Sequence, residues 1–259
     1  MLENLNIADV LYLDIETVSG EATYADLTPD FQKLWKLKCR SVLRKYDEEI
    51  TEEEAAECYT DKAGIYAEFG KIVCISVGII LWDKESETYQ LRLKSFASDD
   101  EKQLLEDFAQ LVNKYYNNPN RHFLCGHNLK EFDVPYTCRR MAIHQLLLPN
   151  MLDIGGKKPW ETKYLLDTLE QWKFGDYKSY TSLKLLAACF GFPSPKDDID
   201  GSEVGRVYWQ EKDLERIAIY CEKDVLAVVQ LVLKMKRMPI LTPEQITSVS
   251  GFNLSLIHI

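Results

Sequence analysis

The sequence lacks the features that would mark a secreted, membrane or zinc-binding protein. No apolar run approaches the roughly 20 residues that a membrane helix needs, and the N-terminus lacks the basic-then-apolar order of a signal peptide. The seven cysteines are scattered and include no CxxC pair, which indicates neither a zinc site nor a disulfide framework. We therefore expect a reduced, cytoplasmic location and no membrane association.

Positive charge is also scarce. The chain carries 31 Lys and Arg against 41 Asp and Glu, a formal net charge of −10. This balance argues against broad, sequence-blind adhesion to nucleic acid. It leaves open a local basic groove, or an acidic cleft whose charge is offset by metal ions. The length of 259 residues and the apolar content of 46% suit a globular protein with one sizeable core.

The order of the expected elements predicts an α/β fold. No internal repeat or low-complexity tract interrupts it. Strand patterns come first, and helices and strands then alternate, which indicates layers of helices on a mixed sheet. The expected strands are 10–18, 69–82, 88–96, 121–128 and 164–167, and the expected helices are 98–116, 132–147, 182–190 and 211–237. The helix at 98–116 is expected to open with a capping box from Ser98 to Glu101.

Residues 1–240 are expected to form a single domain, with residues 19–70 as a helical insertion between two strands and 241–259 as a C-terminal tail. Within the insertion, 33–45 holds six basic residues, no acid and Trp35, and an acid-rich stretch follows. One interpretation is a solvated helical hairpin. The other is a contact with a nucleic-acid backbone. The basic residues that would make this contact are Lys36, Lys38 and Arg40.

The first candidate site lies where an apolar strand gains two acids. Side chains alternate along a strand, so Asp14 and Glu16 share one face. Two like charges at the end of a buried strand repel each other and are costly to desolvate. A divalent cation between them would remove that cost. The alternative is an ordinary strand end that emerges into solvent.

A second acid group follows the strand at 121–128. Gly126 permits a tight turn there, and Asn128 is a plausible N-cap for the next helix. Asp133 then falls in the first turns of that helix, where the alternative is an exposed acid favoured by the helix dipole. His127 is interpreted as a packed or hydrogen-bonded residue.

The third group lies in the long helix at 211–237. Tyr220 and Asp224 are four residues apart, one turn above the other, at the edge of the apolar stripe. A tyrosine beside an acid is often only a packed ring with a satisfied hydroxyl. Taken with the other two groups, however, the chain offers four carboxylates from three elements that one sheet edge can bring together. Such oxygen ligands suit Mg²⁺ or Mn²⁺.

These three motifs, in this order, resemble those of the DEDD-superfamily 3′–5′ exonucleases. The motifs are Asp14-Ile-Glu16-Thr17, then Gly126 to Tyr136, then Tyr220-Cys-Glu-Lys-Asp224. The Tyr-x-x-x-Asp spacing resembles the tyrosine subtype. The second motif, together with 166–169 and 182–188, resembles the proofreading domain of family-B DNA polymerases as a stand-alone protein. The resemblance covers most of residues 7–237.

The resemblance implies an RNase H-like fold with a mixed five-stranded sheet and two divalent ions, Mg²⁺ or Mn²⁺. It implies that Asp14, Glu16 and Asp224 hold one ion and that Asp14 bridges to a second, which Asp133 supports. Tyr220 would position the attacking water. The residues that would contact the terminal nucleotide are Asn128 and Thr17, the latter through its backbone.

Three functions follow from these patterns. The first is a metal-dependent exonuclease that removes nucleotides from the 3′ end of single-stranded DNA. The second is an exoribonuclease that uses the same site, for which contact with the 2′-OH would be the discriminator. The third is a nucleic-acid-binding module that keeps the fold without turnover. The presence of all four acids and the tyrosine favours an active site.

Overall fold

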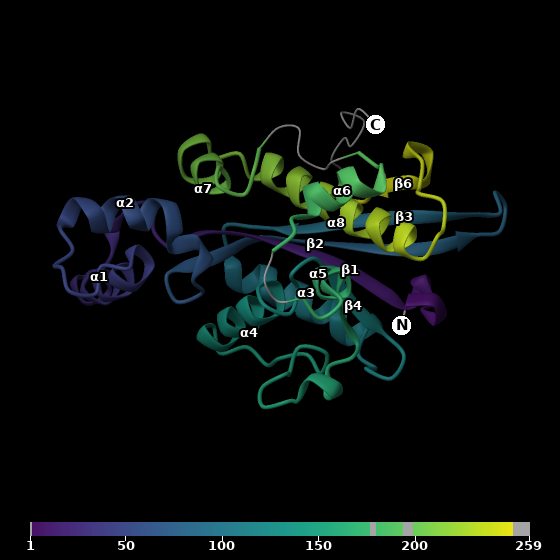
Figure 1. Cartoon of the computed structure of the whole chain (residues 1–259), viewed down its shortest axis with the longest axis horizontal. Helices are drawn as coiled ribbons and strands as arrows, with labels where there is room; N and C mark the ends of the chain where they lie inside the picture. The colour runs from purple at the N-terminus through teal and green to yellow at the C-terminus, as the bar shows by residue number, and fades with distance from the viewer. Residues whose placement is uncertain (1, 177–179, 194–198, 251–259) are drawn as a thin grey trace.

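Six strands form one mixed sheet at the centre of the computed structural model, which describes residues 2–176, 180–193 and 199–250 (Figure 1). The strand order is β5-β4-β1-β2-β3-β6. The strand β2 is antiparallel to β1 and β3, whereas β4 is parallel to β1 and β5, and β6 is parallel to β3. The strands are β1 (Val10–Ser19), β2 (Gly70–Asp83), β3 (Thr88–Ala97), β4 (Phe123–Gly126), β5 (Leu165–Asp167) and β6 (Ile246–Ser248). The predicted α/β class, with a mixed sheet flanked by helices, is confirmed.

The strand count differs from the prediction, because six strands are present instead of five. The extra strand, β6, comes from the segment that was predicted as a C-terminal tail. It is three residues long, and Leu91 pairs with Ile246 to set its register. So short a strand has no alternating pattern to detect, and only its pairing with β3 identifies it. The last predicted tail residues, 253–259, lie outside the described residues.

Helices cover both faces of the sheet (Figure 1). On one face α6 and α8 pack against Val10 and Tyr12 of β1, and on the other face α3 and α4 pack against Leu11, Leu13 and Ile15. This alternation confirms that β1 is a central strand that is buried on both sides. No described helix is both long and apolar enough to cross a membrane. The helices are α1 (Pro29–Leu43), α2 (Glu52–Lys62), α3 (Glu101–Tyr115), α4 (Asp133–Ile143), α5 (Thr168–Lys173), α6 (Leu183–Phe190), α7 (Val204–Arg206) and α8 (Leu214–Met235).

The insertion between β1 and β2 forms a helical hairpin with a hydrophobic cluster of its own. Helices α1 and α2 enclose Trp35, which is fully buried and donates its indole N–H to the carbonyl of Ala55 at 2.8 Å. Thr51 and Glu54 form a reciprocal capping box at the start of α2. The aromatic residue of the basic run therefore stabilises the insertion and is not available to stack on a base.

Helix α3 begins differently from the prediction. Its N-cap is Asp100, whose carboxylate accepts from the backbone N–H of Gln103 at 3.1 Å, so the Ser98 capping box was wrong. Glu101 turns inward instead. Its carboxylate accepts from the Ile72 amide at 2.7 Å and from Arg140 Nε at 2.9 Å. Sequence spacing alone could not show that a residue from α4 competes for the Glu101 side chain.

We expect Glu101→Gln to lower the free energy of unfolding by about 3–5 kcal/mol at pH 7, because it leaves Arg140 without its buried counter-charge. Burial alone would raise the pKa of Glu101, but hydrogen bonds from Arg140, Ile72 and His144 outweigh it and hold the pKa below its usual value. A depressed pKa stabilises the fold above the unfolded-state pKa of about 4.3, and this contribution is lost as the pH falls through the folded-state pKa.

Urea unfolding at pH 7 and pH 3 measures this effect. The difference between wild type and Glu101→Gln should shrink at pH 3, because the unfolded-state carboxylate takes up a proton below about pH 4.3 and the charged folded form then stabilises the fold less. Glu57→Gln, at an exposed position of α2, serves as the matched control. A difference that is the same at both pH values would show that the charge of Glu101 does not stabilise the fold.

Candidate active site

Strand β1 carries the first two acids. Asp14 and Glu16 point to the face of the sheet that α8 covers, because they alternate with residues of the opposite core. The β1–β2 register shifts between Glu16 and Thr17, which marks a β-bulge. Bulges re-aim side chains and are common beside active sites. Asp14 is half-buried and Glu16 is buried, so the strand holds both carboxylates partly out of water.

The turn between β4 and α4 positions Asp133. A Cβ atom at Gly126 would lie 2.9 Å from the carbonyl oxygen of Leu13, so glycine allows β4 to approach β1 closely. Asp133 then occupies the first position of α4 and is 3% exposed. The backbone N–H of Ile15 donates to its carboxylate. Asp133 is therefore fixed directly beside the acidic part of β1.

Asn128 does not cap α4, and that prediction was wrong. Its backbone adopts a left-handed conformation with φ of 66°, and the residue that precedes the helix is Phe132. The turn is held instead by the buried carboxylate of Asp167 at the end of β5. This carboxylate accepts from the backbone N–H groups of Asn128 and Lys130, at 3.0 Å each. Two successive strand ends thus cooperate to shape the loop before Asp133.

Helix α8 supplies the remaining predicted residues. Tyr220 and Asp224 are buried and lie one turn apart, and the tyrosine hydroxyl donates to the Asp224 carboxylate. Cys221 lies between them in sequence, and its Sγ is 3.5 Å from Asp14 Oδ2. Contact between Cys221 and Asp14 brings α8 against β1. The structure therefore brings the five predicted catalytic residues together from three elements.

The carboxylates are close enough to repel one another. Burial raises the pKa of Asp14 well above its usual value, and the charges of Asp133, Asp224 and Glu16 raise it further. Burial also raises the pKa of Asp133 to about 7. A bound cation would relieve both effects. Within the described ranges, ligand atoms of Asp14, Glu16 and Cys221 lie within 4.8 Å of one another, close enough to hold a metal ion.

Comparison with known protein families identifies the family of this chain. Residues 65–248 match the family described as "Predicted 3'-5' exonuclease related to the exonuclease domain of PolB". The chain belongs to this family. The matched residues of this PolB-like exonuclease include Asp133, Tyr220 and Asp224, whereas Asp14 and Glu16 precede the match. Family membership supports a nuclease that acts on nucleic acid and whose acidic cluster can hold divalent metal.

A solved structure is also similar to this chain. It is the family B DNA polymerase from the hyperthermophilic archaeon Pyrobaculum calidifontis, with 15% sequence identity and a TM-score of 0.47. The similarity covers 86% of this chain and 24% of the polymerase chain, so this chain spans about a quarter of the polymerase's length. No curated protein sequence matches the chain.

Sequence reasoning missed three residues of the candidate site. Asp167 carries a signal that could have been used, since an acid between a strand and a helix is a typical N-cap, and it caps α5 here. Cys221 adjoins Tyr220, but its contact with Asp14 depends on how α8 packs. Tyr180 lies in the loop before α6, where no periodic pattern marks it.

Tyr180 is an exposed aromatic residue at the rim of the acidic cluster. Its side chain is 66% exposed, and its ring lies edge-on to His127 with 6.2 Å between the ring centres. The pKa of the Tyr180 hydroxyl is raised by partial burial and by the charges of Asp133 and Asp14. An exposed ring beside such a site is well placed to contact a substrate base.

His127 is a hydrogen-bonded residue, as predicted. Its Nδ1 lies 2.9 Å from the hydroxyl of Thr168, and its Nε2 lies 2.9 Å from the carbonyl oxygen of Thr181. Both ring nitrogens are therefore engaged: Nδ1 joins the β4 turn to the start of α5, and Nε2 joins it to the loop before α6. Burial lowers the pKa of His127, which favours the neutral ring.

The basic residues of the insertion lie apart from the acidic cluster. Lys36, Lys38 and Arg40 belong to α1, at one end of the molecule (Figure 1). Lys36 forms an ion pair with Glu52, and the Lys38 ammonium lies 4.0 Å from the ring centre of Tyr66. Glu52 and the Tyr66 ring therefore partly offset the positive charge of Lys36 and Lys38, which was predicted to contact a nucleic-acid backbone.

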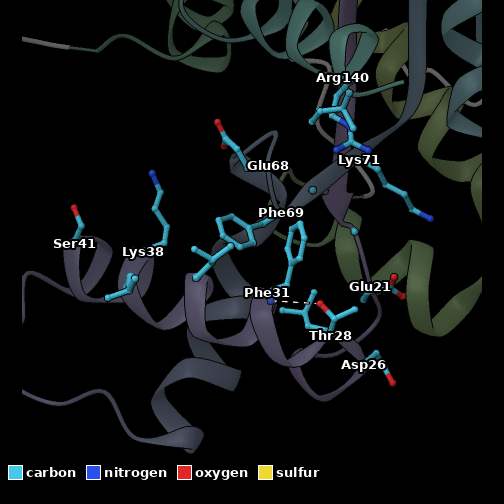
Figure 2. Close-up of a pocket in the computed structure, with 16 residues that line it drawn as sticks. Glu21, Asp26, Thr28, Phe31, Lys38, Ser41, Glu68, Phe69, Lys71 and Arg140 are labelled. Carbon is cyan, nitrogen blue, oxygen red and sulfur yellow. Dashed lines mark hydrogen bonds between the residues drawn. The ribbon is translucent and has the colours of Figure 1, made fainter. Parts of the chain in front are cut away.

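A groove of about 940 Å³ runs beside α1 (Figure 2). Its apolar wall includes Phe31 and Phe69, and Lys38, Lys71 and Arg140 stand at its edge. None of the four acids of the candidate site lines it. The groove is therefore separate from the acidic cluster.

Proposed function

We propose that this protein is a 3′–5′ exonuclease that releases nucleoside 5′-monophosphates from single-stranded DNA with the help of two divalent cations. The observation that carries the proposal is the convergence of Asp14, Glu16, Asp133 and Asp224 in a chain of the PolB-like exonuclease family. Duplex ends would have to fray before they could enter, because stacked bases hold the terminal nucleotide in place. Single strands are therefore the expected substrate.

The acidic cluster fits divalent cations by its chemistry. Carboxylate oxygens are the ligands that Mg²⁺ and Mn²⁺ prefer, and the mutual repulsion of these carboxylates is the cost that cations would offset. Asp14, Glu16 and Asp224 would hold one ion, and Asp14 and Asp133 the second. Two such ions, when bound, stabilise the attacking and the leaving oxygen of an in-line displacement at phosphorus.

The residues of the chain then orient the reactants. Tyr220, whose hydroxyl lies beside Asp224, would position the water that attacks phosphorus. The new P–O bond comes from this water, and the bond from phosphorus to the 3′ oxygen of the preceding nucleotide breaks. The Thr17 backbone and Asn128 would hold the terminal nucleotide. The products are a nucleoside 5′-monophosphate and a strand that is one nucleotide shorter with a free 3′-OH.

Digestion of end-labelled oligonucleotides tests the proposal. Matched single-stranded DNA, duplex DNA and RNA are incubated with Mg²⁺, with Mn²⁺ or with EDTA, and products are resolved from both labelled ends. We expect a ladder that shortens from the 3′ end of single-stranded DNA and stops with EDTA. Faster cleavage of RNA would replace the proposal with an exoribonuclease, and binding without cleavage would replace it with a silent binding module.

We expect Tyr180→Ala to raise KM for a single-stranded oligonucleotide about 5- to 150-fold, because stacking of a base on an aromatic ring contributes about 1–3 kcal/mol. Tyr180→Phe keeps the ring and should retain most of the wild-type KM. Tyr115→Ala removes an exposed tyrosine from α3 and is the matched control. Steady-state kinetics that give the same KM for Tyr180→Ala and wild type would exclude base stacking at this position.

A further inference from the structure

Glu222 is a buried acid that the reaction outlined above does not use. It lies on α8 between Tyr220 and Asp224, and its side chain is fully shielded from solvent. The structure shows no ion pair for it within the described residues. A buried carboxylate without such a partner is costly unless hydrogen bonds stabilise it. Hydrogen bonds must therefore offset the cost of burying the Glu222 carboxylate.

Three serine hydroxyls supply these hydrogen bonds. Glu222 Oε1 accepts from Ser95 at 2.9 Å, from Ser248 at 3.1 Å and from Ser250 at 2.8 Å. Ser95 belongs to β3, Ser248 ends β6, and Ser250 follows it. The Ser250 hydroxyl also accepts from the backbone N–H of Ser95 at 2.7 Å. One carboxylate oxygen thus joins α8, β3 and the C-terminal segment.

These serines continue a row of polar residues that starts at the candidate active site. Asp14 of β1 pairs with Ser76 of β2, and Ser76 pairs with Ser95 of β3, with 2.7 Å between the two hydroxyl oxygens. Helix α8 crosses this row. At one end of the row, Cys221 of this helix contacts Asp14. At the other end, Glu222 of the same helix accepts hydrogen bonds from the serine hydroxyls.

Glu222 lies on the opposite flank of the helix from Tyr220 and Asp224. Successive residues of an α-helix are about 100° apart, so Glu222, two residues from each of them, points about 160° away from both. Rotation of α8 by about 10° would move side-chain ends about 1 Å, since the helix radius with side chains is about 5–6 Å. Displacements of that size in reacting groups can cost about 100-fold in rate. A contact that prevents this rotation therefore matters to the site.

We infer that Glu222, Ser95, Ser248 and Ser250 form a clamp that fixes the rotation of α8 and thereby positions Tyr220 and Asp224 against Asp14. The clamp makes the C-terminal segment that contains β6 part of the support of the metal site. This inference rests on the proposed function, in which Asp14 and Asp224 share a cation. Glu222 is a positioning residue and does not contact the substrate.

Titration with Mn²⁺ alone, followed by electron paramagnetic resonance, tests the clamp without any turnover. The double variant Ser248→Ala/Ser250→Ala should bind Mn²⁺ about 10- to 100-fold more weakly than wild type, the loss typical of removing supporting hydrogen bonds around metal ligands. With oligonucleotide substrate, kcat should fall while KM stays within about two-fold of the wild-type value. Ser86→Ala, in the exposed β2–β3 turn, is the control.

Substitution of Glu222 itself distinguishes positioning from folding. Glu222→Gln keeps an oxygen that accepts from the serines and should retain Mn²⁺ affinity within about three-fold of wild type, whereas Glu222→Leu should lose it like the double variant. Circular dichroism and thermal unfolding identify variants that do not fold, and Ser250→Ala alone then replaces the double variant. Wild-type Mn²⁺ affinity in the folded serine variants would overturn the clamp alone. A wild-type protein that binds no Mn²⁺ would overturn the proposed function and the clamp with it.

Discussion

Asp14→Ala and Asp224→Ala are each expected to abolish Mg²⁺-dependent release of mononucleotides from single-stranded DNA. Asp14 lies at the centre of the cluster, where the charges of Asp133, Asp224 and Glu16 all act on it. Loss of either carboxylate removes a ligand of the proposed cations, and the remaining acids would then bind those cations more weakly. The measurement is the initial rate of 5′-mononucleotide release at saturating Mg²⁺.

The control for these variants is Asp61→Ala, which removes an exposed aspartate from α2. It should cleave at the wild-type rate. Both active-site variants should also remain folded, because neutralising a crowded cluster removes repulsion. Mg²⁺-dependent cleavage that survives in Asp14→Ala and in Asp224→Ala would contradict the assignment of these acids.

Tyr220→Phe is expected to reduce kcat by about 10²- to 10⁴-fold, the range for loss of a positioned proton-transfer or water-orienting group. The variant loses the hydroxyl that donates to Asp224 and keeps the buried ring that packs in the core around β2 and α8. The effect should therefore fall on kcat, with KM for the oligonucleotide little changed. Single-turnover kinetics with bound substrate separate the chemical step from product release.

A matched variant for this experiment is Tyr46→Phe, which removes an exposed hydroxyl from the insertion. It should leave kcat unchanged. If Tyr220→Phe also cleaves at the wild-type rate, the hydroxyl has no part in the reaction. A rise in KM without a fall in kcat would instead indicate that Tyr220 contacts the substrate.

The catalytic candidates could be predicted from sequence because each depends on local spacing. Strand alternation placed Asp14 and Glu16 on one face, and helical spacing placed Tyr220 one turn from Asp224. Their meeting in space followed from the order of strands and helices. Burial on both faces also identified β1 as a central strand. These features are set by nearest neighbours along the chain and by general rules of α/β sheets.

The errors concern residues whose partners lie far away in sequence. Glu101 fits a capping box after Ser98, but Arg140 and Ile72 bind its carboxylate. Asn128 fits an N-cap, but Asp167 holds its backbone in another conformation. In each case a tertiary contact competes with the local one, and the sequence gives no measure of which contact is stronger.

The short strand β6 also has a consequence for association between molecules. A strand at the edge of a sheet exposes backbone groups that can pair with another chain. β6 pairs with Leu91, Arg92 and Leu93 of β3 and so occupies that stretch of the edge. Loss of β6 would open two apolar positions and their backbone groups to intermolecular pairing. The C-terminal segment therefore covers the backbone of 91–93 and leaves a strand of only three residues as the outer strand there, and short edge strands offer few groups for such pairing.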